Sequence, residues 1–183
     1  MKIVLNFMRL KIRFFKYFLK AIKNNFFQKK KLPNNLPTVL VISTGGVATT
    51  TLIKYLKLFS NINCENDSDG LKHLIRPPEV DYKKTKIIYI SGSDEKIFNS
   101  LKRRNIFNEQ MMKLGCPLSF LFTGKLEKYF FSRCIKRQKK NFYNNDKILT
   151  LMFDEIWDKK EIIKNYLDID SKLFLEEFPS KKV

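Results

Sequence analysis

The stretch TVLVISTGGVATTTLIKYL, residues 38–56, decides the fold of this chain. It opens with a short apolar, β-branched run at 38–42, which is typical of a buried parallel strand. Two glycines and three threonines follow, and the pattern becomes helical from residue 50 to residue 59. A strand that passes through a glycine-containing loop into a helix is the unit that cradles phosphates in α/β proteins.

Two later segments repeat the strand pattern, KIIYIS at 86–91 and ILTLMF at 148–153. Helices are expected over residues 94–104 (with Ser93 or Asp94 as N-cap), 117–140 and 159–167. Strands that alternate with helices predict a three-layer α/β fold around a central parallel sheet. We expect this domain to span residues 38–170 and a C-terminal tail to span 171–183.

The positive charge is concentrated near the N-terminus. Of the net +18, residues 1–31 hold ten Lys and Arg and no acid, at helical spacing opposite a Phe-rich side. This predicts a basic amphipathic helix over 1–31, followed by a proline-containing linker at 32–37. The helix would lie on an anionic membrane surface or pack on the domain, and both interpretations stay open. Its recurring charges argue against a spanning helix and against a signal peptide.

The three cysteines are far apart, without a CxxC pair and without a cluster around the single histidine. This spacing predicts neither a metal site nor a disulfide framework, and a reducing compartment follows as the default. We therefore expect a cytoplasmic protein, peripheral at the inner membrane face if residues 1–31 bind lipid.

The loop after the first expected strand has the features of an anion site. Gly45 and Gly46 allow close approach of the backbone, and hydroxyl donors surround them. These donors are Thr44, Thr49, Thr50 and Thr51. A Walker A loop would need Gly-Lys-Ser/Thr where Ala48-Thr49-Thr50 stands, so hydrolysis of ATP or GTP is poorly supported. The alternative is an ordinary strand-to-helix turn.

Residues 47–52, VATTTL, resemble the 5′-phosphosulfate loop of the sulfotransferase family. Gly46 stands where the family has a basic residue, and Ala48 where it has Gly. After the second strand Gly92 takes the place of the family's Arg, while Ser100 follows eight residues later, as in the family. The segment KILTLMFDEIWDKKEIIKNYLDI is similar to the family's late strand, acidic turn and closing helix. The resemblance covers roughly residues 38–169.

The resemblance implies a P-loop-type fold and 3′-phosphoadenosine-5′-phosphosulfate as co-substrate. Loop 44–51 would then hold the 5′-phosphosulfate, and Ser100 with Arg103 or Arg104 the 3′-phosphate. Lys54 and Lys72 are further candidates for the charge that the family places at the position of Gly46. The acceptor would be a hydroxyl, in the family often on a saccharide, and the chemistry requires no metal.

Sulfonyl transfer also needs a base for the acceptor hydroxyl and positive charge near the transferred group. The polar stretch NDSDGLKHLIRPP supplies both types of group, in Asp69, Lys72 and His73. His73 is the preferred base because its pKa lies near neutral pH; a packing role is the alternative.

Three other functions stay in view. One is a non-catalytic nucleotide- or membrane-binding protein on the same fold, and another is a small P-loop kinase. Nucleic-acid binding is the third and is unlikely to be the main role, because residues 1–31 account for over half of the excess charge.

Overall fold

The computed structural model describes residues 36–47, 49–116 and 123–180. Three parallel strands form its sheet in the order β1-β2-β3: β1 (Val39–Ser43), β2 (Lys86–Ser91) and β3 (Ile148–Met152). The expected α/β class with a parallel sheet is therefore confirmed, and each strand lies within one residue of its predicted bounds. The predicted helix over 1–31 lies outside the described residues, as does all of the linker except positions 36 and 37.

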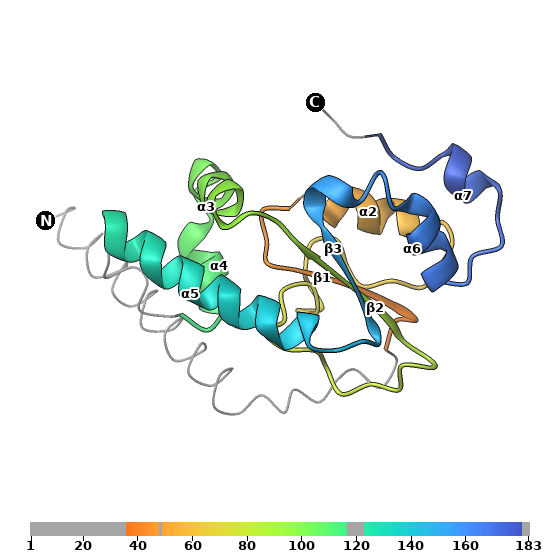
Figure 1. Cartoon of the computed structure of the whole chain (residues 1–183), viewed down its shortest axis with the longest axis horizontal. Helices are drawn as coiled ribbons and strands as arrows, with labels where there is room; N and C mark the ends of the chain where they lie inside the picture. Colours follow the sequence, from red (N-terminus) through yellow and green to blue (C-terminus); the bar gives the residue numbers. More distant parts are fainter. Residues whose placement is uncertain (1–35, 48, 117–122, 181–183) are drawn as a thin grey trace, which may run out of the picture.

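The helices fill the two crossovers and the C-terminal end of the chain (Figure 1). The first crossover contains α2 (Thr49–Leu56), and the second contains α3 (Asp94–Arg103), α4 (Phe107–Lys113) and α5 (Gly124–Tyr143). After β3 come the 3-10 turn η2 (Phe153–Glu155), α6 (Lys160–Tyr166) and α7 (Leu173–Glu176). No helix in the described ranges combines the length and apolarity that crossing a bilayer requires.

Local sequence explains why α3 begins and ends where it does. Ser93 is its N-cap, and the Ser93 side chain accepts a hydrogen bond from the backbone N–H of Lys96 at 3.2 Å. Acidic residues occupy the first turn and basic residues the last, which matches the helix dipole.

The helix α4 was not predicted from the sequence. It has only seven residues, and the side chain of its N-cap residue, Ile106, makes no hydrogen bond to the first turn.

Two hydrophobic clusters cover the two faces of the sheet. Val41 and Ile88 belong to the larger one, which includes residues of every helix from α2 to α7. The alternate residues, Leu40 and Tyr89, pack on the opposite face with Phe142 at the end of α5, whose ring stacks on Tyr89 at 4.3 Å. β1 and β2 are thus buried on both faces, as their continuous apolar runs require, while β3 is only partly buried.

The chain from the end of α6 through α7 belongs to the folded core. Phe174 is fully buried, and its ring lies 5.4 Å from that of Tyr55 and 5.3 Å from that of Phe59. The Tyr55 hydroxyl donates to the backbone oxygen of Phe174. Residues of the predicted C-terminal tail therefore cover α2, and their burial contributes to the stability of that helix.

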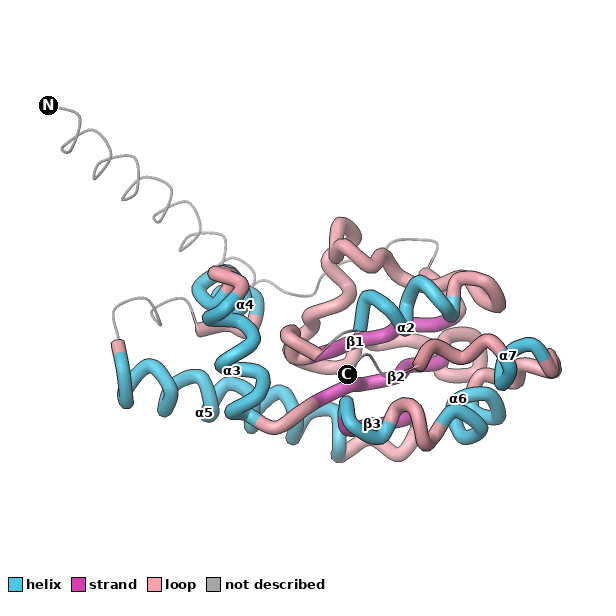
Figure 2. Tube along the Cα trace, turned by 90° about the horizontal axis from the view of Figure 1, so that it is seen from above, coloured by secondary structure: helices cyan, strands magenta, loops and turns pink. Residues whose placement is uncertain are grey.

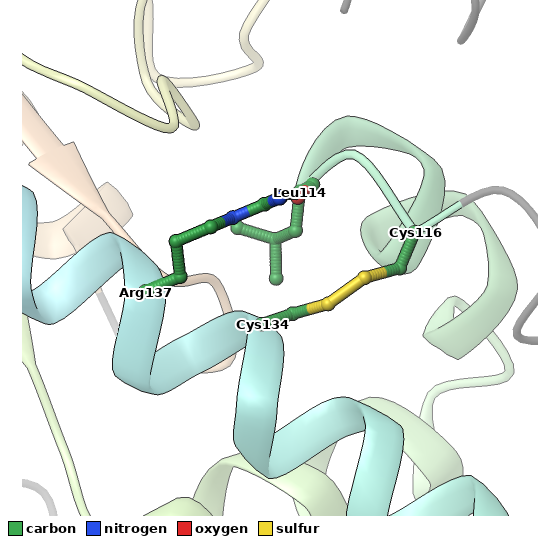
Figure 3. The surroundings of a disulfide bond; sticks show 4 residues. All are labelled: Leu114, Cys116, Cys134 and Arg137. Carbon is green, nitrogen blue, oxygen red and sulfur yellow. Dashed lines mark hydrogen bonds between the residues drawn. A yellow bond between two sulfur atoms is a disulfide. The ribbon is translucent and has the colours of Figure 1, made fainter.

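The expectation that no cysteines pair is wrong. Cys116, just after α4, and Cys134 in α5 form a disulfide, and their Cα atoms are 6.9 Å apart (Figure 3). In the same region the guanidinium of Arg137 donates to the backbone oxygen of Leu114 at 2.9 Å. The packing of α4 on α5 brings together two cysteines that sequence spacing did not connect.

Candidate functional site

The loop between β1 and α2 folds back on the end of its strand. Gly45 and Gly46 have φ values of +86° and +69°, a region that residues with a Cβ rarely adopt. The Gly45 N–H donates to the Ser43 Oγ at 3.3 Å, and this oxygen lies 3.5 Å from the Thr49 Oγ1 at the start of α2. The loop is therefore a tight turn that ends at a helix N-terminus, the arrangement that binds anions in other α/β proteins.

A residue that the sequence analysis missed covers one side of this loop. Gln110 in α4 is buried, and its Nε2 donates to the backbone oxygen of Thr44 at 2.9 Å. A Cβ on Gly45 would come within 2.7 Å of the Gln110 side-chain amide. Gly45 is thus required both by its φ and by this contact. The sequence contains no other indication of this contact than a glutamine, and the helix that carries the glutamine was itself not predicted.

Ser100 of α3 lies beside the loop. A Cβ on Gly46 would be 3.5 Å from the Ser100 Cβ and 3.4 Å from the backbone oxygen of Ile97. The C-terminal end of α3 also carries Arg103 and Arg104, and both side chains are exposed. The structure therefore brings together the loop and α3, the two segments proposed to hold the two ends of the nucleotide.

Lys72 reaches the first turn of α2 from the loop that follows the helix. Its side chain is buried, and its Nζ donates to the Thr50 Oγ1 at 3.0 Å and to the backbone oxygen of Glu65 at 2.7 Å. Burial lowers the pKa of Lys72; nearby Asp67 opposes this effect and Arg104 adds to it. A cation thus stands at the threonine-rich loop although the loop sequence contains none.

Further charged groups surround Lys72. Asp67 accepts a hydrogen bond from the Lys72 backbone N–H at 2.9 Å, and its other carboxylate oxygen pairs with the Lys113 ammonium at 2.8 Å. Lys113 and Arg104 both act on Lys72 electrostatically. Glu65 also acts on Lys72, and Glu109 pairs with Lys113 at 3.3 Å, so three cations and three carboxylates share this place.

His73 is oriented by the end of β1. Its Nδ1 lies 3.0 Å from the backbone oxygen of Ser43. Burial lowers the pKa of His73 to about 4, against the opposing effect of that hydrogen bond. A carbonyl oxygen only accepts, so in the neutral imidazole Nδ1 carries the proton and Nε2 keeps a lone pair. At neutral pH His73 is therefore uncharged with a lone pair on Nε2, but its pKa lies below the near-neutral value expected from the sequence, which makes it a weaker base than expected.

The other predicted site residues include Asp69, which bonds to its own loop, and the threonines of α2, which differ in exposure. The two carboxylate oxygens of Asp69 accept from the backbone N–H groups of Cys64, at 2.6 Å, and Leu71, at 3.0 Å, so Asp69 shapes its own loop. In α2 Thr49 is buried while Thr51 is exposed. Within the described ranges no group of three or more His, Cys, Asp and Glu side chains is placed to hold a metal ion.

Gly92, where the family has an arginine, is approached by a cation from another element. The Lys139 Nζ of α5 donates to the Gly92 backbone oxygen at 2.9 Å and to the Asp94 carboxylate at 2.8 Å. A Cβ on Gly92 would lie 3.1 Å from the Val47 Cγ1, so little space is left for a side chain. Lys139 is a further residue near the candidate site that the sequence did not predict.

Comparisons of the chain with protein-family models, with curated proteins and with solved structures find no match.

Proposed function

We propose that this protein binds 3′-phosphoadenosine-5′-phosphosulfate at the loop of residues 43–51 and transfers its sulfonate to an acceptor hydroxyl. The observation that carries the proposal is the contact between the buried Lys72 ammonium and Thr50 in the first turn of α2. This lysine supplies positive charge beside a loop whose own sequence has none. The carbohydrate class of the acceptor rests on the sulfotransferase resemblance alone.

The residues of the site have distinct roles in this proposal. The backbone of Gly45 and Gly46 and the hydroxyls of 49–51 hold the 5′-phosphosulfate, with Lys72 balancing its charge. Ser100 and Arg104 contact the 3′-phosphate. The acceptor oxygen forms the new S–O bond, its proton passes to the His73 Nε2, and the 3′,5′-bisphosphate leaves as the old S–O bond breaks. Asp69 acts by shaping the loop that carries Lys72 and His73.

Calorimetric titration with 3′-phosphoadenosine-5′-phosphate tests the donor site, with ATP-Mg titrated in parallel. We expect micromolar binding of the bisphosphate, none of ATP-Mg, and binding about 10- to 100-fold weaker in Lys72→Met, because a hydrogen bond to a charged group is lost. Lys83→Met is the matched control, since Lys83 is exposed and precedes the N-terminal end of β2, whereas the loop follows the C-terminal end of the parallel strand β1. The variant Thr49→Ala/Thr50→Ala should also bind the bisphosphate more weakly, although it keeps Lys72.

Equal affinity of the Lys72 and Lys83 variants, at unchanged thermal stability, would contradict this site. Binding of ATP-Mg would favour the small-kinase alternative. Binding of the bisphosphate without sulfonate transfer to any hydroxyl acceptor would favour the non-catalytic alternative, which is also supported at Gly92. There Asp94 already pairs with the Lys139 ammonium, which lowers the charge available for a 3′-phosphate.

The cellular location is also a proposal. A cytoplasmic, membrane-peripheral protein would lose vesicle binding when residues 1–31 are deleted. The disulfide between Cys116 and Cys134 is typical of oxidising compartments. Alkylation of thiols in intact cells decides the matter: a cytoplasmic location predicts that the two sulfurs are reduced and modified there, and protection of both would overturn it.

A further inference from the structure

One side of α5 carries a row of four exposed cations, with Tyr129 among them and Tyr143 at the end of the row. Positions 125, 129, 133, 136, 140 and 143 step by four, four, three, four and three, which aligns them along the helix. The row, called the α5 stripe below, consists of Lys125, Tyr129, Arg133, Lys136, Lys140 and Tyr143. The two tyrosines are 58% and 44% exposed, and the neighbouring Leu126 is 57% exposed.

The four cations of the stripe make no ion pair with any described residue, whereas their neighbours on the flanks of α5 do. Lys128 pairs with Glu95 at 3.3 Å and Lys139 with Asp94 at 2.8 Å. Like charges three or four residues apart on a helix repel each other, as Lys136 does with Lys140. The acids of α3 thus neutralise one flank of the helix and leave the stripe uncompensated.

The fold fixes the direction in which the stripe points. Phe131, Ile135 and Phe142, on the other side of α5, are fully or almost fully buried, and the disulfide at Cys134 ties the helix to the chain after α4. The helix therefore cannot rotate its cations toward the domain. From residue 125 to residue 140 the row extends about 22 Å, and Figure 2 shows α5 running past the sheet along the outside of the domain.

We propose that the α5 stripe binds the surface of an anionic lipid bilayer. A row of exposed side chains along one side of a helix can meet a flat surface along its length, and each cation near anionic headgroups strengthens the attraction. Tyr129 and Leu126 add amphipathic and apolar groups of the kind that the interfacial region accommodates. Nucleic acid fits less well, because the exposed Leu126 beside the cations can enter the interfacial region of a bilayer but has no partner on a phosphate backbone.

This inference is independent of the nucleotide site, and it concerns residues other than 1–31. The test is co-sedimentation of the full chain with vesicles of phosphatidylcholine and phosphatidylserine, at sub-saturating lipid. Lys136→Gln/Lys140→Gln is the stripe variant. Lys54→Gln/Lys172→Gln is the matched control, since these exposed lysines belong to the α2–α7 side of the domain and also remove two charges.

We expect the stripe variant to bind about 25-fold more weakly, because each cation near the surface contributes about fivefold in affinity. The control should keep most of its binding, and pure phosphatidylcholine should bind neither variant. Since residues 1–31 are present in every protein, the difference between the two variants reports on α5 alone. Equal losses in the two variants would overturn the proposal.

A second measurement places the stripe at the lipid directly. In Tyr129→Trp, the new indole should shift its emission to the blue on vesicles and be quenched by brominated lipid, with the wild-type signal of Trp157 as background. An unchanged spectrum would overturn the proposal. A single-stranded oligonucleotide whose binding falls in the stripe variant, while vesicle binding does not, would instead assign the stripe to nucleic acid.

Discussion

Replacing Gly45 by alanine should destabilise the protein through two separable effects. The first is backbone strain: at φ +86° an L-residue costs about 1 kcal/mol. The second is a clash, because the new Cβ would come within 2.7 Å of the Gln110 amide. Gln110 would have to move and give up its hydrogen bond to the Thr44 oxygen, at a cost of about 1–3 kcal/mol for buried groups. We expect the free energy of unfolding to fall by about 2–4 kcal/mol.

Gly124 provides the matched control for this substitution. It also has a positive φ, +62°, but nothing lies within 4 Å of where its Cβ would be. Gly124→Ala should therefore cost only the strain, about 1 kcal/mol. Urea unfolding followed by the fluorescence of Trp157 and by far-ultraviolet circular dichroism measures both losses.

A double-mutant cycle isolates the clash itself. In a Gln110→Ala background the added methyl group of Gly45→Ala has space, so the substitution should cost about 1 kcal/mol there, as it does at Gly124. If Gly45→Ala and Gly124→Ala cost the same in the wild-type background, or if the presence of Gln110 makes no difference, the proposed role of Gln110 as the cover of the loop is refuted.

Three further predictions follow from the buried groups. The pKa of His73 is about 4 when folded and about 6.5 when unfolded, so the unfolded chain binds the extra proton; stability is complete above pH 6.5 and falls by up to about 3 kcal/mol toward pH 4. Proton NMR of this single imidazole measures the pKa, and a midpoint near 6.5 would contradict the lowered pKa. Reducing the Cys116–Cys134 disulfide, whose partners are 18 residues apart, should cost about 3 kcal/mol in urea unfolding, and no loss would show that the bond does not constrain the unfolded chain. Phe174→Ala should cost about 3–5 kcal/mol by the same assay, whereas a loss below 1 kcal/mol would show that α7 is not part of the core.

The sheet was predictable because its signal is local. Each strand is a continuous apolar run, and such runs are typical of strands buried on both faces. The start of α3 was predictable for the same reason, since Ser93 caps the turn that directly follows it. α4 has neither a cap nor enough length to show a clear period, and it was missed.

The site was predictable only in its local part. The glycines and threonines of the loop are adjacent in sequence, but the groups that complete the site come from 22 and 66 residues away, Lys72 on Thr50 and Gln110 on Thr44. No periodicity encodes such contacts, which depend on how the helices pack. The pairing of Cys116 with Cys134 was missed for the same reason.

The contact between Gln110 and the Thr44 oxygen also sets an order of events during synthesis. The loop leaves the ribosome early, but the glutamine that covers it is made 66 residues later. At roughly 5–20 residues per second, this interval is about 3–13 s. During that time β1 and α2 exist without the cover of their loop, and the nascent chain acquires its finished loop only when α4 arrives.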